Sequence, residues 1–195
     1  MTLILASSSP YRRELLQRLR LPFQCQSPDI DERPRPDEDP RALARRLARD
    51  KALRVLPDRP GALVIGSDQV ATCDGRPVGK PGSHEAAFAQ LRAFSGREVL
   101  FHTAVCVTDG RRHLQEEVTT ACAFLPLSDA QIEHYLRAEQ PYDTAGSAKA
   151  EALGIALMAG MRSDDPTALI GLPLIAVCRM LREFGLDPLQ PALLP

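Results

Sequence analysis

Short apolar runs and helical stripes of apolar residues alternate along the chain. An apolar run over Thr2–Ala6 predicts a short buried strand, and the leucines that follow Pro10 form one stripe of a helix. The same reasoning predicts further strands at 23–26, 62–65 and on both sides of an Asp109-Gly110 turn, and helices at 40–56, 83–94, 128–139 and 173–184. Because hairpins and crossovers are both present, we expect an α/β or α+β domain with a mixed sheet.

Local signals mark several of these boundaries. Asp39-Pro40 is typical of a helix start, Ser128 and Gln131 have the spacing of a capping box, and Asp74-Gly75 predicts a hairpin turn. The helix over 40–56 is expected to turn its leucines inward and its arginines outward. The segment before it, SPDIDERPRPDEDP, is too rich in proline for a helix interior and predicts an exposed loop. A solvated linker is the simplest interpretation of that loop.

Composition limits the classes of protein to consider. The 195 residues fit a single domain over 1–195, and a net charge of −1 does not favour wrapping of nucleic acid. The N-terminal apolar run is too short for a signal peptide or a membrane span. The five cysteines are scattered and contain no C-x-x-C pair, so we expect free thiols in a cytoplasmic protein.

The stretch ASSSPYRREL is the densest polar cluster near a predicted helix start. Free backbone N–H groups and the helix dipole favour an anion there, serine hydroxyls add donors, and arginine guanidiniums match phosphate oxygens. The alternative is that Ser9 only caps the helix while Arg12 and Arg13 are solvated. This stretch by itself leaves the two interpretations open.

Two further polar sites follow the apolar run at 62–65. Asp68, in IGSDQV, is expected just beyond the end of that strand, where a carboxylate can bind a magnesium ion or orient a water molecule. Lys80, in GKPG, is a possible phosphate contact in a tight loop. A turn aspartate and a solvated loop lysine are the plain alternatives.

The motifs LASSSPYRRELL, DIDERP, SDQV, GKP, AGSAKAEALG and GLPL occur in this order from residue 3 to about residue 185. In this series the chain resembles the Maf family of nucleoside triphosphate pyrophosphatases. The resemblance implies an ITPase-like α/β fold, with an elongated mixed sheet, flanking helices and a cleft between two lobes. It also implies a nucleotide substrate, a divalent metal ion (Mg²⁺ or Mn²⁺) and the possibility of a homodimer.

The resemblance also assigns roles to individual residues. Asp68 matches the proton acceptor, and Glu32 matches an acidic residue near the metal, so both are candidate metal ligands and catalytic residues. Lys80 is the third candidate catalytic residue. The phosphate-side positions are matched by Ser7, Ser9, Arg12, Arg13, Lys51 and Lys80. With these groups, water would attack the α-phosphorus while preorganised cations stabilise the leaving diphosphate.

Three positions bear on the base. Tyr11, Gln69 and Glu151 depart from the branch that acts on dTTP and UTP, and resemble the YceF-type branch that acts on 7-methyl-GTP, although that branch commonly has tryptophan at position 11. A tyrosine ring can stack on the cationic 7-methylguanine, and a carboxylate can accept two hydrogen bonds from its edge. A dTTP/UTP pyrophosphatase remains the alternative within the family. A nucleotide-binding regulator of cell division is the alternative outside catalysis.

Overall fold

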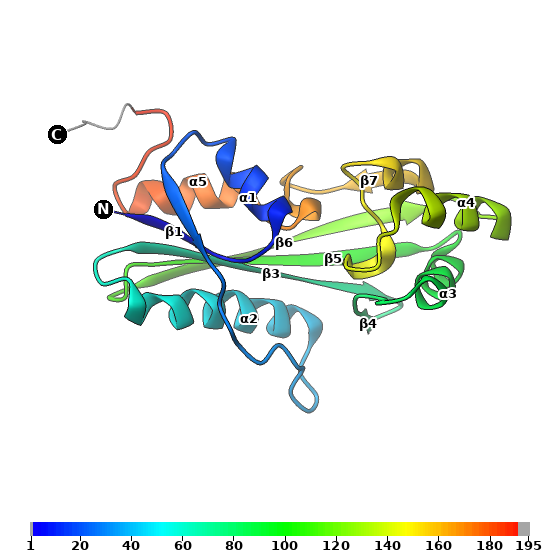
Figure 1. The fold of residues 1–195 in the computed structure, drawn as a ribbon, viewed down its shortest axis with the longest axis horizontal. Helices are drawn as coiled ribbons and strands as arrows, with labels where there is room; N and C mark the ends of the chain where they lie inside the picture. The colour runs from blue at the N-terminus through cyan, green and yellow to red at the C-terminus, as the bar shows by residue number, and fades with distance from the viewer. Residues whose placement is uncertain (1, 191–195) are drawn as a thin grey trace. The chain divides into compact units, whose positions relative to one another are not determined.

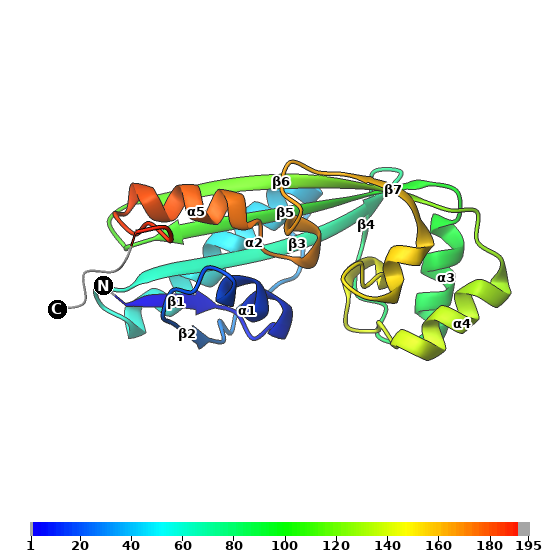
Figure 2. The same cartoon turned by 90° about the horizontal axis from the view of Figure 1, so that it is seen from above.

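The computed structural model describes residues 2–190, so the ends of the expected domain at residues 1 and 191–195 lie outside the described residues. The chain divides into two compact units (Figures 1 and 2). Of the described residues, unit 1 holds 2–68, 103–117 and 165–190, and unit 2 holds 69–102 and 118–164. The prediction of a single domain stays a prediction, and we describe each unit by itself.

Within residues 2–190, seven strands form one mixed sheet in the order β2-β1-β3-β5-β6-β7, with β4 paired to β3. The strands and α-helices, in chain order, are β1 (Leu3–Ala6), α1 (Pro10–Gln17), β2 (Phe23–Gln26), α2 (Pro40–Val55), β3 (Leu63–Cys73), β4 (Arg76–Val78), α3 (His84–Phe94), β5 (Glu98–Thr108), β6 (His113–Phe124), α4 (Asp129–Glu139), β7 (Met158–Arg162) and α5 (Leu174–Glu183). The β1–β2 and β1–β3 pairs are parallel, whereas the β3–β4 and β6–β7 pairs are antiparallel. The expected mixed α/β fold is therefore confirmed.

Unit 1 has helices on both faces of its sheet. In Figure 1, α1 and α5 lie on one face and α2 on the other. The core on the first face joins leucines of β1 and β3 to α1 and α5, through residues such as Leu5, Ile65, Leu15 and Val177, all fully buried. Successive strand residues point to opposite faces. Leu63, Ile65 and Ser67 therefore share the α1/α5 face, and Val64, Gly66 and Asp68 share the α2 face.

The approach of α2 to β3 depends on Gly66. A Cβ atom at this position would lie 2.2 Å from the Ala48 carbonyl oxygen and 2.7 Å from the Ala52 nitrogen, both backbone atoms of α2. No side chain fits there without moving the helix away from the sheet. This contact brings the middle of α2, including Lys51, against the part of β3 that carries Asp68.

The helix starts are formed as the sequence predicts. Ser9 accepts the Arg12 backbone N–H, and Asp39 accepts those of Arg41 and Ala42. Ser128 and Gln131 form the complete capping box at α4. Among the described residues, no helix is both long enough and apolar enough to span a bilayer.

Unit 2 packs α3 and α4 beside the strands that it contains. The Phe94 and Phe124 rings lie 5.4 Å apart in its core. Gly146, with a φ of +71°, approaches Phe101 so closely that a Cβ atom would lie 3.0 Å from the ring. The segment between α4 and β7 contains two short 3₁₀ segments, Ala145–Ser147 and Leu153–Leu157.

Three expectations need correction. Asp68 does not follow the end of a strand, because β3 continues to Cys73; only its parallel pairing with β1 ends at Gly66. Strand β7 was not predicted, and it forms by antiparallel pairing with β6. Arg46 of α2 is not outward-facing: its side chain is only 10% exposed because Glu38 binds it.

Candidate functional site

A buried lysine joins the two predicted catalytic carboxylates in unit 1. Lys51 Nζ lies 2.6 Å from Asp68 Oδ1 and 2.7 Å from Glu32 Oε1. Lys51 and Asp68 are 6% and 7% exposed, whereas the Glu32 side chain is 53% exposed. A buried charge is costly unless it is paired, so each of these groups depends on the others. The loop that carries Glu32 is thus part of the site and not only a linker.

Asp68 lies where the sheet of unit 1 opens. The parallel pairing of β1 with β3 ends at Ala6 and Gly66, two residues before Asp68. Its Oδ1 accepts the Lys51 hydrogen bond, which leaves Oδ2 without a hydrogen-bond partner within residues 2–190. A carboxylate oxygen in this condition can accept a proton from water or bind a cation.

Arg12 enters the same region from α1. Its Nε donates to the Gly171 carbonyl oxygen at 2.8 Å, which orients the guanidinium. Burial lowers the pKa of Arg12, and the nearby charges of Asp68 and Glu32 oppose that effect. An arginine stays protonated even when its pKa falls somewhat, so the site holds a fixed cation.

Two serines of ASSSPYRREL accept backbone hydrogen bonds at the start of α1. Ser7 Oγ accepts the Ser9 N–H at 3.1 Å, and Ser9 Oγ accepts the Arg12 N–H at 3.4 Å. The capping interpretation is therefore confirmed for Ser9. In both cases the hydroxyl oxygen is the acceptor, so each O–H can still donate to an oxygen of a ligand.

A divalent cation fits the carboxylates of this site. Asp68 and Glu32 already converge on one cationic atom, Lys51 Nζ, each through a single oxygen. Mg²⁺ is commonly held by one or two carboxylates, with substrate phosphates and water completing its ligands. Over the described part of the chain, no group of three or more His, Cys, Asp or Glu side chains could hold a metal by itself. The donor set thus fits a metal that binds together with a phosphate ligand.

In unit 2, Gln90 of α3 links the loop of Lys80 to the loop after α4. Its Nε2 donates to the Gly79 carbonyl oxygen at 3.1 Å, and its Oε1 accepts the Ser147 hydroxyl at 2.6 Å. The Gly82 N–H also donates to the Tyr142 carbonyl oxygen at 3.0 Å. The two loops are therefore held together at two points.

His84, at the start of α3, adds a third link. One ring nitrogen lies 3.0 Å from the Tyr142 hydroxyl, and the other lies 2.9 Å from Glu133 Oε2. Glu133 also accepts from Arg137 at 2.7 Å, and the two hydrogen bonds lower its pKa.

The structure brings part of the predicted site together. Unit 1 gathers Ser7, Ser9, Arg12, Glu32, Lys51 and Asp68. On α1, Tyr11 is half-buried and Arg13 is exposed. The other three candidates, Gln69, Lys80 and Glu151, belong to unit 2, where Lys80 and Glu151 are exposed. The roles of all these residues in binding or catalysis stay predictions.

Sequence reasoning missed several residues that position the site. Ser67 Oγ lies 2.8 Å from the Ala104 carbonyl oxygen and 2.9 Å from that of Gly171, the acceptor that orients Arg12. Gly171 belongs to the GLPL motif, which had no assigned role, and its φ of +120° favours glycine. Gly66 is likewise required by packing that no local pattern reveals.

Arg46 positions the loop that carries Glu32. It donates to the Arg33 carbonyl oxygen at 3.0 Å and binds Glu38 through two hydrogen bonds of 2.6 and 2.8 Å. These hydrogen bonds lower the pKa of Glu38 to about 2. The loop is therefore fastened to α2 on both sides of its proline-rich turn.

Two carboxylates that share one ammonium, beside a half-buried arginine and two serines at a helix start, suit a protein that handles phosphate groups. This chain belongs to the Maf-like protein family, whose model matches residues 2–184. It is 65% identical over 188 residues to a 7-methyl-GTP pyrophosphatase of Bordetella avium, covering 96% of this chain and 95% of that protein. A protein of the same name from Ralstonia nicotianae is 60% identical over 183 residues, covering 93% and 94% of the two chains.

Among solved structures, the Staphylococcus aureus Ham1 protein is similar with a TM-score of 0.47 and 14% identity, over 65% of this chain and 73% of that chain. The predicted membership of the Maf family is confirmed by the family match. The cleft between two lobes that the resemblance implies stays a prediction.

Proposed function

We propose that this protein is a nucleoside triphosphate pyrophosphatase that hydrolyses 7-methyl-GTP to 7-methyl-GMP and diphosphate. The observation that carries the reaction type is the buried Lys51 ammonium between Asp68 and Glu32, with the Arg12 guanidinium nearby. The choice of substrate is supported by relatives of this name that match the chain over almost its whole length.

In the proposed reaction, Asp68 is the proton acceptor. Its free Oδ2 takes the proton of a water molecule as the water oxygen bonds to the α-phosphorus. The bond between that phosphorus and the bridging oxygen breaks, and diphosphate leaves with the electron pair. Lys51 orients Asp68, because its ammonium donates a hydrogen bond to Oδ1 and so fixes that oxygen.

The phosphate side of the substrate is assigned to the remaining cations and hydroxyls of unit 1. Arg12 donates from the guanidinium nitrogens that do not bind Gly171, and the Ser7 and Ser9 hydroxyls donate to phosphate oxygens. Charge grows on the leaving diphosphate, so donors already in place lower the barrier. Arg13 and Lys80 are proposed to contribute charge to the same phosphates.

A divalent cation, Mg²⁺ or Mn²⁺, is proposed as the cofactor, with Asp68 and Glu32 as its protein ligands. When bound, it would supply charge that offsets the phosphates and polarises their oxygens. Lys51 contacts one oxygen of Asp68 and one of Glu32, which holds the two carboxylates close together.

Selectivity for the base is assigned to three residues. Tyr11 would stack on the cationic ring of 7-methylguanine, and Glu151 would accept hydrogen bonds from its N1–H and N2–H₂ edge. Gln69 follows Asp68 in β3, and strand alternation turns its side chain to the opposite face. Its proposed part in base recognition therefore needs its own test.

A substrate panel with product identification tests the proposal. Purified protein would be given 7-methyl-GTP, GTP, UTP and dTTP, with Mg²⁺, with Mn²⁺ and with a chelator. We expect diphosphate and 7-methyl-GMP as products, with the highest kcat/KM for 7-methyl-GTP and no turnover with the chelator. Preference for UTP and dTTP would instead indicate the pyrimidine branch. Binding without hydrolysis of any nucleotide would indicate a regulator.

Location and assembly complete the proposal. We propose a cytoplasmic enzyme, and this is supported by five cysteines that are all free in the structure. A homodimer is proposed from the family resemblance. Light scattering coupled to size-exclusion chromatography would test it.

A further inference from the structure

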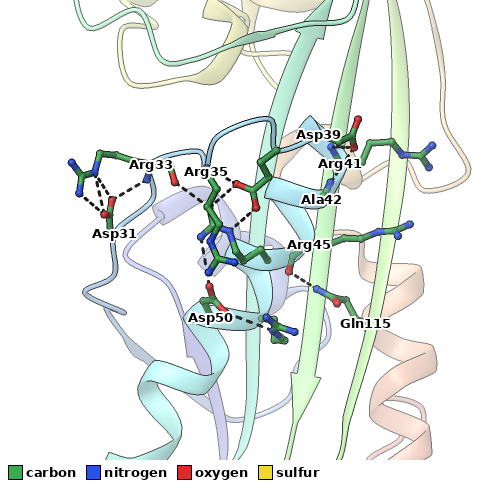
Figure 3. Close-up of polar contacts among 12 residues, drawn as sticks. Asp31, Arg33, Arg35, Asp39, Arg41, Ala42, Arg45, Asp50 and Gln115 are labelled. Carbon is green, nitrogen blue, oxygen red and sulfur yellow. Dashed lines mark hydrogen bonds and ion pairs between the residues drawn. The ribbon is translucent and has the colours of Figure 1, made fainter.

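Unit 1 has a second concentration of guanidinium groups, and none of the predicted site residues lines it. A cavity of about 550 Å³ is lined by five arginines from α2 and the loop before it, with Gln115 of β6 at one side. The arginines are Arg35, Arg41, Arg45, Arg46 and Arg49, and Figure 3 shows the region. Apart from Ala42, every lining residue is polar or charged.

Three of the arginines form one row along α2. Arg41, Arg45 and Arg49 are spaced four residues apart, so their Cβ atoms follow one another at about 5–6 Å on the same helix face. Their side chains are 56%, 53% and 44% exposed, so all three reach solvent. A ligand with several negative groups at short intervals matches such a row.

Two side chains of β6 hold this row of arginines in place. Glu117 of β6 has a side chain with no exposed surface, and it accepts from Arg41 Nε at 2.8 Å and from an Arg45 terminal nitrogen at 3.3 Å. The Gln115 side chain donates to the Arg45 carbonyl oxygen. Each of the two guanidiniums uses one donor group on Glu117 and keeps its remaining N–H groups for a ligand.

The carboxylates that line the cavity are already engaged. Glu38 is bound by Arg46 and by the Arg35 backbone N–H, and Asp39 caps α2 through the N–H groups of Arg41 and Ala42. The Arg35 side chain has no hydrogen bond or ion pair within residues 2–190. The Arg49 side chain has one ion pair, 3.6 Å from Asp50. The cavity thus has more unused donors than unused acceptors.

We propose that this cavity binds a condensed phosphate, such as a linear inorganic oligophosphate or the phosphate chain of a nucleotide. Guanidiniums match phosphate oxygens through paired N–H donors, and a row at this spacing contacts successive groups of one chain. Among the described residues, the lining contains five guanidinium groups and no aromatic side chain. Its charge and its paired N–H donors match phosphate oxygens, so the phosphates are the part of a ligand that this site recognises.

The test is an NMR titration of isotope-labelled full-length protein with sodium tripolyphosphate, without divalent metal. We expect amide shifts at residues 35–49 and 115, with an affinity that falls as salt is added. Shifts confined to residues 7–13, 51 and 68 would mean that tripolyphosphate binds only the candidate catalytic site, and would overturn the proposal. An absence of saturable shifts at 35–49 would overturn it as well.

The decisive variant is R35Q/R49Q, because Arg41 and Arg45 pair with Glu117 whereas Arg35 and Arg49 do not. We expect it to weaken tripolyphosphate binding at residues 41–45 by about tenfold or more, and to leave 7-methyl-GTP hydrolysis unchanged. The matched control is R54Q/R92Q, which removes two exposed arginines, each with one ion pair longer than 3.5 Å, from outside the cavity. Equal weakening by the control would show a general charge effect and overturn the site.

Titrations with further ligands distinguish an inorganic phosphate chain from the phosphate chain of a nucleotide. They also test other classes of ligand. Equal affinity for tripolyphosphate and for ATP would support recognition of the phosphates alone, from either source. Tighter binding of guanosine than of tripolyphosphate at residues 35–49 would contradict it. Tighter binding of hexaglutamate or of a single-stranded oligonucleotide at the same residues would also overturn the proposal, since the cavity would then serve a macromolecule. Each result is read by NMR, so it is independent of whether the protein hydrolyses 7-methyl-GTP.

Discussion

At the scale of single residues, the sequence and the structure contribute different parts of the site. The resemblance identified Lys51, Glu32 and Asp68 one by one, but no local pattern indicated that one ammonium joins the two carboxylates. That arrangement depends on how closely α2 packs on β3 at Gly66, a contact between segments distant in sequence. Capping by Ser9, by contrast, is local and was predictable from the residues themselves.

The first prediction concerns the proton acceptor. Asp68→Asn keeps a similar shape and can still accept a hydrogen bond from Lys51, but it cannot take a proton from water. We expect kcat to fall by about 10²- to 10⁴-fold, with a similar circular dichroism spectrum. Steady-state kinetics with 7-methyl-GTP would measure it.

The control for this change is Asp74→Asn, at the exposed turn after β3. It removes the same charge and should leave kcat within about twofold. If Asp68→Asn retained near wild-type turnover, Asp68 would be neither the proton acceptor nor a required metal ligand.

The second prediction concerns the thiols. Burial raises the pKa of Cys106 to about 11 and that of Cys122 to about 12, whereas Cys25 is exposed. At pH 8 the native protein should therefore react with a thiol reagent at Cys25 well before Cys106 or Cys122, and denatured, unreduced protein should show five thiols. Fewer than five would indicate a disulfide or a modified cysteine.

The same pKa shifts have a consequence for stability. A thiol with a higher pKa in the folded state stabilises the fold fully below its unfolded pKa of about 8.5. That contribution is lost as the pH rises through the folded values of about 11 and about 12. The free energy of unfolding should accordingly decrease between about pH 9 and pH 11. C106A/C122A, compared with the wild type in urea melts, should show a smaller decrease.

At the scale of elements, helix starts were predicted more accurately than the last strand. Ser83, Asp39 and the Ser128–Gln131 pair mark their helices through hydrogen bonds within a few residues. Strand β7 has the sequence MAGMR, with two small residues and no alternation, and it pairs with β6 across a register shift. Its pairing partner, rather than its own sequence pattern, makes it a strand.

The third prediction concerns Gln90 as a positioning residue. Gln90→Leu removes the donor to the Gly79 carbonyl and the acceptor for Ser147, so the loop of Lys80 loses one of its attachments to the loop after α4. Two hydrogen bonds of about 0.5–1.5 kcal/mol each suggest a decrease in kcat/KM of roughly fivefold to a hundredfold. We expect this decrease for all nucleotides, since Lys80 is assigned to the phosphates.

A double-mutant cycle with Lys80→Met separates positioning from general destabilisation. If Gln90 acts through Lys80, Gln90→Leu should have little further effect on kcat/KM in the Lys80→Met background. Additive losses, together with a lower melting temperature, would show that Gln90 supports only the fold of unit 2.

At the scale of the whole chain, the residues assigned to the proposed function are distributed over both compact units. The match covers residues 2–184 and thus includes both units. Sequence reasoning predicted the α/β class and most elements, because these follow from local periodicity and caps. Most residues assigned to the phosphates lie in unit 1, whereas Glu151, assigned to the base, lies in unit 2. Selectivity can therefore be tested separately from the chemistry.

The last prediction is that Glu151→Gln weakens hydrolysis of 7-methyl-GTP much more than hydrolysis of UTP. Guanine presents two adjacent donors to a carboxylate, and uracil has no such pair. Replacing a charged acceptor of two hydrogen bonds should cost about 1–3 kcal/mol, or roughly tenfold to a hundredfold in kcat/KM. Glu85→Gln, at another exposed position of unit 2, is the matched control and should change neither substrate.

Substitutions of Tyr11, which is proposed to stack on the ring of 7-methylguanine, also test the assignment of this base. Tyr11→Trp should preserve or improve kcat/KM for 7-methyl-GTP, because indole gives the stronger cation–π interaction, and Tyr11→Ala should lose less than Glu151→Gln loses. Since UTP carries no ring cation, its kcat/KM should change little in Tyr11→Trp. If Glu151→Gln reduced kcat/KM equally for both nucleotides, Glu151 would have a structural or catalytic role, and the choice of 7-methyl-GTP would rest on the relatives alone.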